Sequence, residues 1–306
     1  MIPGGIDGSR SVAFHSLMMR LVAELRSQLP SAPTVVELGN QTFKPQSGDV
    51  ERVAALLAGQ TLPFDAALLN DIARRSGDAL NASTADYYRA LGFAGYRTID
   101  VNARYGSLVM DLNRDVVAHY GFTERFEFVT NNGTGEHVFN QAAVFANAHA
   151  LCKAGGIMLH VLPFVNYLNH GFFSFNPILF HDLAAANGYD IVRLSIASNQ
   201  GLEIGDSAAA VTLTRTELQE RCAVDGSPRG SFLHLTRLGK SGKRTRRPLS
   251  VALRRVMTKG PNVSVVAALR KTNDAAFQFP IQGMYSGANI ADPHLRETYS
   301  TGPVAR

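Results

Sequence analysis

The residues of this chain that could do acid–base chemistry gather around one polar stretch, residues 131–137, which reads Asn-Asn-Gly-Thr-Gly-Glu-His. Its last two members, Glu136 and His137, belong to the residue types that most often move protons in enzymes. His170 follows in a loop rich in phenylalanine, close after Tyr167. A histidine there could act as a general base or orient a ligand by a hydrogen bond. We therefore take these four side chains as candidate catalytic residues.

The polar stretch lies between two apolar runs, residues 126–130 and 156–163, and a helical pattern separates it from the second run. This order predicts a strand, a loop, a helix and a parallel strand. Because such crossovers are right-handed, the polar loop is expected at the carboxyl edge of the sheet, where open α/β sheets bind ligands. Glu136 and His137 would then begin the helix, a position that also favours an acidic residue for electrostatic reasons alone.

Three further strands are expected before this region. Residues 34–38 form a β-branched apolar run that ends in an acid and a glycine, Glu37 and Gly39. Residues 96–102 carry Asp100 at their end, where a carboxylate suits the hydroxyls of a ribose. Residues 108–112 end in Asp111 and Leu112. The acids thus follow consecutive strands of one predicted sheet.

This order of elements resembles the class I S-adenosylmethionine-dependent methyltransferases, whose first strand ends in acid-x-Gly-x-Gly-x-Gly. Here Gly39 is kept, whereas Gln41 and Phe43 stand where the later glycines would be. The resemblance implies S-adenosylmethionine as cofactor, with Asp100 on its ribose and Asp111 and Leu112 against its adenine. The implied cofactor-binding residues are Glu37, Gly39, Asn40, Gln41, Asp100, Asp111, Leu112, Asn131 and Asn132.

Three segments carry a closer resemblance: NNGTGEHVFNQ, GGIMLHVLPF and YLNHGFFSFNP. They look like a bacterial subgroup of methyltransferase-like proteins with the patterns N-x-G-T-x-E-H and N-H-G-[FY]-[FY], over residues 33–196. The implied fold is an α/β, Rossmann-like class I methyltransferase fold with a seven-stranded, mostly parallel sheet. A sixth strand over residues 189–197, ending at Ser195, would pair antiparallel with a closing strand at residues 263–271.

Two reactions are compatible with this resemblance. The first is methyl transfer to a small-molecule acceptor in bacterial secondary metabolism. In the second, S-adenosylmethionine is itself the substrate: its amine closes a four-membered ring, which gives azetidine-2-carboxylate and methylthioadenosine. For that reaction Tyr167 and its phenylalanine neighbours would hold the sulfonium by cation–π contact, while Asn131 and Ser195 orient the amine. A non-catalytic S-adenosylmethionine-binding module is a third possibility. A Rossmann dehydrogenase is disfavoured because no G-x-G-x-x-G follows the first strand.

The predicted organisation has three parts: a helical cap at residues 1–30, the cofactor-binding domain at residues 31–285, and a mobile tail at residues 286–306. The cap contains an amphipathic helix over residues 11–29 that packs on the core or closes over a ligand, with Arg26 among the residues expected off its apolar face. Residues 44–95 form an insertion. Its expected helices cover residues 49–58, 64–76 and 84–91, and the last contributes Tyr87 and Tyr88.

The formal net charge of +5 comes from one segment, because residues 237–259 carry nine Lys or Arg and no acid. Glycine, serine and proline in this segment favour a solvated loop. A docking patch for an acidic carrier domain or a phosphate-bearing substrate is the alternative. Nucleic acid is disfavoured, since no aromatic residue is interleaved for base stacking. The sequence leaves the oligomeric state open.

Composition and residue spacing limit the remaining possibilities. The chain has 306 residues, 45% of them hydrophobic, and no apolar run approaches the roughly 20 residues that span a bilayer, so no membrane partner is expected. Cys152 and Cys222 form no CxxC pair, which fits a reducing cytoplasm. No metal site is expected either, because the histidines show no i, i+4 pair with a carboxylate and no cysteine at ligand spacing. The histidines considered are His137, His149, His160, His170 and His181.

Overall fold

A computed structural model of the chain describes residues 13–46, 48–58, 62–76, 83–198 and 262–281, together with Pro293. Several expectations lie outside these residues: the start of the cap at residues 1–12, the basic loop at residues 237–259, Cys222, and the tail at residues 286–306 apart from Pro293. The use of the basic loop as a docking patch stays a prediction. Among the described helices, none combines the length and the apolar character needed to cross a membrane.

The centre of the structure is a seven-stranded sheet with the order β5-β4-β2-β6-β7-β9-β8. All neighbouring strands are parallel except at β9, which runs antiparallel to both β7 and β8. This arrangement confirms the predicted Rossmann-like class I methyltransferase fold. The strands are β2 (Thr34–Leu38), β4 (Gly95–Asp100), β5 (Leu108–Val109), β6 (Phe126–Asn132), β7 (Cys152–Val165), β8 (Asp190–Ser198) and β9 (Val263–Arg270).

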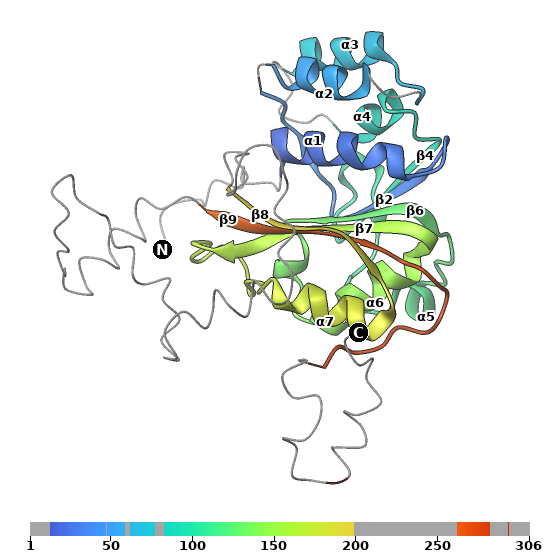
Figure 1. The fold of residues 1–306 in the computed structure, drawn as a ribbon, viewed down its shortest axis with the longest axis vertical. Helices are drawn as coiled ribbons and strands as arrows, with labels where there is room; N and C mark the ends of the chain where they lie inside the picture. Colours follow the sequence, from blue (N-terminus) through green and yellow to red (C-terminus); the bar gives the residue numbers. More distant parts are fainter. Residues whose placement is uncertain are drawn as a thin grey trace, which may run out of the picture.

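Helices cover both faces of this sheet (Figure 1). One face carries α1 (Ser16–Leu25), α2 (Asp49–Ala58), α3 (Ala66–Ser76) and α4 (Ala85–Ala90), and the other carries α5 (Val116–Tyr120), α6 (Gln141–Leu151) and α7 (Ile178–Asn187). Strand side chains alternate between two cores, so that Val35 enters the first core, under α1, and Val36 the second, under α6. Parallel strands buried on both faces read as continuous apolar runs, which is why the sequence reveals them.

The N-terminal helix is a core helix, but it is shorter than predicted. It begins at Ser16, after a two-residue strand, β1 (Ala13–Phe14), that pairs with β3 (Thr42–Phe43). The expectation for Arg26 was wrong, because this side chain is fully buried in the 3₁₀ turn η1 (Arg26–Gln28). Its guanidinium donates to the carbonyl oxygens of Pro30, Ser31, Leu91 and Gly92. An amphipathic pattern cannot reveal such a residue, since its partners are backbone carbonyl groups beyond the helix, and two of them, at Leu91 and Gly92, lie far along the chain.

The helices of the insertion agree with the predicted ranges. Thr84 precedes α4 and its hydroxyl donates to Glu37, while the hydroxyl of Ser83 accepts the backbone N–H of Ala85. Tyr87 and Tyr88 are completely buried among the aromatic rings of the first core. The insertion therefore supplies packing to the sheet.

Candidate functional site

The loops that follow β2 and β6 touch each other at the carboxyl edge of the sheet. Gly39 adopts a φ of +83°, and a Cβ built on it would lie 2.0 Å from Oγ1 of Thr134. A left-handed backbone and a contact this close both require glycine. Gly39 is the glycine that this chain keeps from the acid-x-Gly-x-Gly-x-Gly pattern, and it is the residue at which the two loops meet.

Gln41 and Asn132 join the same two loops. Asn132 Nδ2 donates to Gln41 Oε1 over 2.9 Å, and Gln41 Nε2 donates to the backbone oxygen of Asn132 over 2.9 Å. Both side chains are buried. Gln41 stands where the acid-x-Gly-x-Gly-x-Gly pattern has a glycine, and its two hydrogen bonds hold the loop after β2 against the end of β6. Direct contact of either residue with a cofactor stays a prediction.

Asp100 lies at the carboxyl end of β4, as predicted, beside the turn that contains Gly39. Its Oδ2 accepts the backbone N–H of Asn40 at 2.9 Å. Its Oδ1 accepts from the backbone N–H and the side-chain amide of Asn102. A carboxylate offers about four acceptor sites, so these three bonds hold Asp100 in place without filling it. The side-chain amide of Asn40 donates to Asn102 and Ser107, which connects the loop after β2 to the loop after β4.

Asp111 and Leu112 follow the short strand β5. Asp111 Oδ1 accepts both the backbone N–H and the side-chain amide of Asn113, and these bonds lower the pKa of Asp111 below its usual range. These bonds give Asp111 a turn-forming role. Leu112 is buried in the second core. Their contact with an adenine ring stays a prediction.

Glu37 does not lie at the open edge. Its side chain points into the first core, where Oε2 accepts from Thr84 Oγ1 over 2.8 Å and from Tyr96 OH over 2.9 Å. Burial raises the pKa of Glu37 from 4.5 to about 7, although both hydroxyl bonds act against this shift. Glu37 therefore has an internal role, joining β2 to α4 and β4, and its contact with a cofactor stays a prediction.

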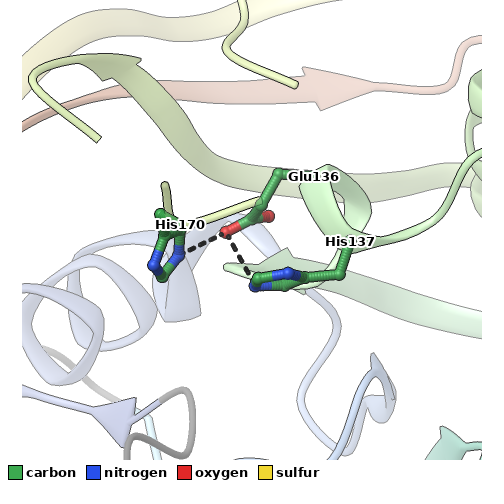
Figure 2. A group of neighbouring side chains, drawn as sticks. All are labelled: Glu136, His137 and His170. Atoms are coloured by element: carbon green, nitrogen blue, oxygen red, sulfur yellow. Dashed lines mark hydrogen bonds and ion pairs between the residues drawn. The ribbon is translucent and has the colours of Figure 1, made fainter. Parts of the chain in front are cut away.

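The acid–base residues converge, although they come from two different loops. Glu136 Oε1 lies 3.3 Å from Nε2 of His170 and 3.8 Å from Nε2 of His137, and Figure 2 shows both imidazoles directed at this oxygen. Glu136 is completely buried, whereas both histidine side chains are partly exposed to solvent. The cluster thus has a buried acid at its base and two imidazoles at its mouth.

The local structure around Glu136 differs from the prediction. Glu136 and His137 lie in a separate 3₁₀ turn, η3 (Gly135–His137), and α6 begins only at Gln141. The side chain of Asn140 accepts the N–H of Ala143, which starts the helix at this later residue. Glu136 is therefore not explained as an ordinary acidic residue at a helix N-terminus.

The loop of His170 is fixed directly onto the turn of Glu136. The N–H of Phe172 donates to the backbone oxygen of Glu136 over 2.8 Å. A Cβ at Gly171 would lie 2.8 Å from Cγ of Glu136, so only glycine permits this approach. Because β6 and β7 are neighbours, the loops after their carboxyl ends meet. The three side chains are thereby held close together before any ligand binds.

Aromatic rings surround this cluster. The Tyr167 ring lies 5.2 Å from that of His170, and its hydroxyl makes a 2.7 Å hydrogen bond with Ser264. Phe139 and Phe172 pack edge to face, and their side chains are 75% and 69% exposed. Exposed aromatic pairs beside a polar cluster are typical of ligand-binding surfaces. The predicted aromatic surroundings of His170 are therefore present, although Phe175 belongs to the second core.

Two of the predicted catalytic residues are buried. Asn131 is buried, with its Oδ1 on the N–H of Gly135 and its Nδ2 3.3 Å from the His160 ring. The expectation that β8 ends at Ser195 was wrong, because the strand continues to Ser198 and Ser195 is buried opposite Val266. Their proposed role in orienting an amine stays untested, and these internal positions argue against it.

His149, His160 and Cys152 have structural roles. His149 lies between the Tyr189 hydroxyl and the carbonyl of Ala275. His160 is buried in β7, and burial lowers its pKa to about 4. Burial also raises the pKa of Cys152 to about 12, which leaves the thiol protonated and unreactive.

The sequence alone did not reveal that Glu136, His137 and His170 form one cluster. Each offers one ligand atom, and these atoms all lie within 4.8 Å of one another. Spacing rules for metal sites test neighbours on one element, whereas these ligands come from η3 and from the loop after β7. The strand order could have indicated this cluster, since η3 follows β6, the His170 loop follows β7, and β6 and β7 are adjacent parallel strands.

Comparison with known proteins adds little beyond the architecture. No protein-family model matches the sequence, and no curated protein matches it. Solved structures that resemble it include an O-methyltransferase of a trans-AT polyketide synthase multienzyme from Brevibacillus brevis, in complex with S-adenosyl-L-homocysteine. It is 14% identical, with 85% of this chain and 73% of that chain covered and a TM-score of 0.35.

Two further structures are S-adenosylmethionine-dependent methyltransferases in complex with S-adenosyl-L-homocysteine. The one from Thiobacillus denitrificans is 14% identical, covers 83% of this chain and 90% of its own, and has a TM-score of 0.33. The one from Geobacter sulfurreducens is 13% identical, covers 86% of this chain and 94% of its own, and has a TM-score of 0.34. Likeness at this level assigns neither a family nor a reaction to the chain.

Proposed function

We propose that the chain binds S-adenosylmethionine at the carboxyl edge of its sheet and transfers the methyl group to a small-molecule acceptor. The bond from sulfur to the methyl carbon breaks, the acceptor bonds to the methyl group and loses a proton, and S-adenosylhomocysteine leaves. The observation that carries the proposal is the Asp100 carboxylate at the end of β4, bonded to the turn that begins at Gly39. In nucleoside-binding α/β folds this position holds a ribose.

The cluster at η3 would serve the acceptor. His170, held by Glu136, would accept the acceptor's proton, and the exposed rings of Phe139 and Phe172 would contact its apolar part. This arrangement favours an acceptor with an apolar body and one ionisable group, as is common in bacterial secondary metabolism. The basic segment 237–259 is proposed to dock an acidic carrier domain that delivers such an acceptor.

Replacing Asp100 by alanine is expected to weaken S-adenosylmethionine binding by about 1.5 to 3 kcal/mol, the range for removing a charged hydrogen-bond partner. Asp100→Asn should lose less, because its amide oxygen can still accept the N–H of Asn40. Isothermal calorimetry measures both variants. Asp86→Ala, on the exposed side of α4, is the matched control and should bind like the wild type. Unchanged affinity in Asp100→Ala would move the ribose site elsewhere.

Cyclisation of S-adenosylmethionine to azetidine-2-carboxylate is the second candidate. Tyr167 supports it, since its ring lies beside His170 at the open edge. The buried positions of Asn131 and Ser195 count against it, because they were the groups expected to orient the amine. Methyl transfer is therefore the preferred reaction.

Product analysis separates the candidates. With S-adenosylmethionine alone, methyl transfer predicts no turnover, and addition of a cell extract should produce S-adenosylhomocysteine above a boiled control. Methylthioadenosine formed from S-adenosylmethionine alone, at a rate that collapses in Tyr167→Ala, would show cyclisation instead. If neither product accumulates while the cofactor still binds, the chain is a binding module.

A further inference from the structure

We infer that Glu136, His137 and His170 form a binding site for a divalent transition-metal ion, with Zn²⁺ the best match. Two imidazoles and one carboxylate are a ligand set that suits zinc and the neighbouring first-row metals. The inference concerns this cluster alone and does not depend on S-adenosylmethionine binding.

The distances agree with a shared ion. Zinc–nitrogen and zinc–oxygen bonds of about 2.1 Å place tetrahedral ligands about 3.4 Å apart. Glu136 Oε1 lies 3.3 Å from Nε2 of His170 and 3.8 Å from Nε2 of His137. The three donor atoms, all within 4.8 Å of one another, therefore need only small side-chain movements to close around one ion.

Burial of the carboxylate gives a second, independent argument. Glu136 is completely buried, and its Oε2 has no hydrogen-bond partner among the described residues. A buried carboxylate is costly unless a positive charge or hydrogen bonds compensate it. Among the described residues, the polar partners of its side chain are the two histidine rings. A divalent ion between these three residues would supply the missing charge and could engage the free oxygen.

The site is rigid on its buried side and open on the other. Gly171 and the N–H of Phe172 fix the His170 loop against Glu136, so the ligands are positioned before the ion arrives. The partly exposed imidazoles leave the outer side to water. Three protein ligands with an open position are typical of catalytic rather than structural zinc. If the proposed methyl transfer holds, an oxygen of the acceptor could take the open position. The metal would then lower the pKa of that group, and water on the exposed side would accept its proton in place of His170.

The test is a calorimetric titration of the untagged full chain with Zn²⁺ alone, after removal of metals with a chelator. The wild type is expected to bind one ion at this site, and His137→Ala and His170→Ala should each weaken that binding at least about tenfold. His119→Ala removes an exposed histidine on α5 and is the matched control, with unchanged binding expected. Melting of each metal-free variant is measured alongside, because both substituted histidines are partly exposed and should leave the fold intact.

Two results would overturn the inference. One is a wild type that binds no stoichiometric Zn²⁺. The other is binding that stays the same in His137→Ala and His170→Ala, which would place the ion elsewhere. Gly171→Ala provides a further check, since it keeps all three ligands but displaces the loop. It should lower the Zn²⁺ affinity without abolishing the fold, and unchanged affinity would contradict a site in which this loop positions His170 as a ligand. Because no S-adenosylmethionine is present, failure here is distinct from failure of the proposed methyl transfer.

Discussion

Gly39→Ala is expected to destabilise the protein by about 2 to 5 kcal/mol and to weaken S-adenosylmethionine binding strongly. A left-handed backbone costs a non-glycine residue about 1 to 2 kcal/mol, and forced packing adds about 1 to 3 kcal/mol. The new methyl group would meet Thr134 at Oγ1, Cγ2 and Cβ, at 2.0, 2.7 and 2.9 Å, so that rotating one side chain does not relieve the clash. Urea denaturation and calorimetry measure the two effects.

Gly121→Ala is the matched control for this variant. Gly121 ends α5 with a φ of +66°, and a Cβ there meets no atom within 4 Å. Gly121→Ala should be destabilised only by the cost of the left-handed backbone, about 1 to 2 kcal/mol, and should bind S-adenosylmethionine like the wild type. Combining Gly39→Ala with Thr134→Gly should recover part of the stability. Equal losses in the two single alanine variants would show that contact between the β2 and β6 loops is unimportant.

The difference in free energy of unfolding between Glu37→Gln and the wild type is expected to shift by about 3 kcal/mol in favour of the variant between pH 4.5 and pH 8. Burial raises the pKa of Glu37 in the folded protein to about 7, above its unfolded value near 4.5. Between these values the folded chain binds more protons than the unfolded chain, so stability falls as pH rises. Glutamine carries no charge and escapes this loss.

His160 acts in the opposite direction over much of the same range. Burial lowers its pKa to about 4, so its contribution is complete above about pH 6.5 and is lost as pH falls. The contributions of Glu37 and His160 to stability oppose each other between pH 4.5 and 6.5. In Glu37→Gln the contribution of His160 is no longer opposed by that of Glu37, so the free energy of unfolding should rise more steeply with pH than in the wild type. Urea denaturation from pH 4.5 to 8 measures it. Glu51→Gln, exposed on α2, is the control, and an unchanged profile in Glu37→Gln would contradict a buried, titrating carboxyl.

The sheet was predictable from sequence because its information is local. Buried parallel strands give continuous apolar runs, and their carboxyl ends carry turn glycines and polar residues, as at Gly39 and Asp100. The same reasoning failed for Arg26, whose partners include the carbonyl groups of Leu91 and Gly92, far along the chain. It also misplaced the end of β8, since Ser195 lies in a run that continues through Ser198 without a breaking residue.

The site was only partly predictable. Glu136, His137 and His170 were recognised singly from residue type and loop position, but their convergence depends on the pairing of β6 with β7 and on the close approach at Gly171. Conversely, Gln41, Asn131 and Asn132 have the polar character of ligand-binding residues, yet their side chains make hydrogen bonds within the protein. A sequence names donors and acceptors, whereas only the fold decides which of them are already paired.

The central claim is that the carboxyl edge of this sheet binds S-adenosylmethionine. Calorimetry of the wild-type chain with S-adenosylmethionine, S-adenosylhomocysteine and NAD⁺ in separate titrations tests it most directly. The account predicts one-to-one binding of both adenosyl ligands and no binding of the dinucleotide. Absence of heat with both adenosyl ligands, together with tight binding of NAD⁺, would contradict it and make a dehydrogenase the better interpretation.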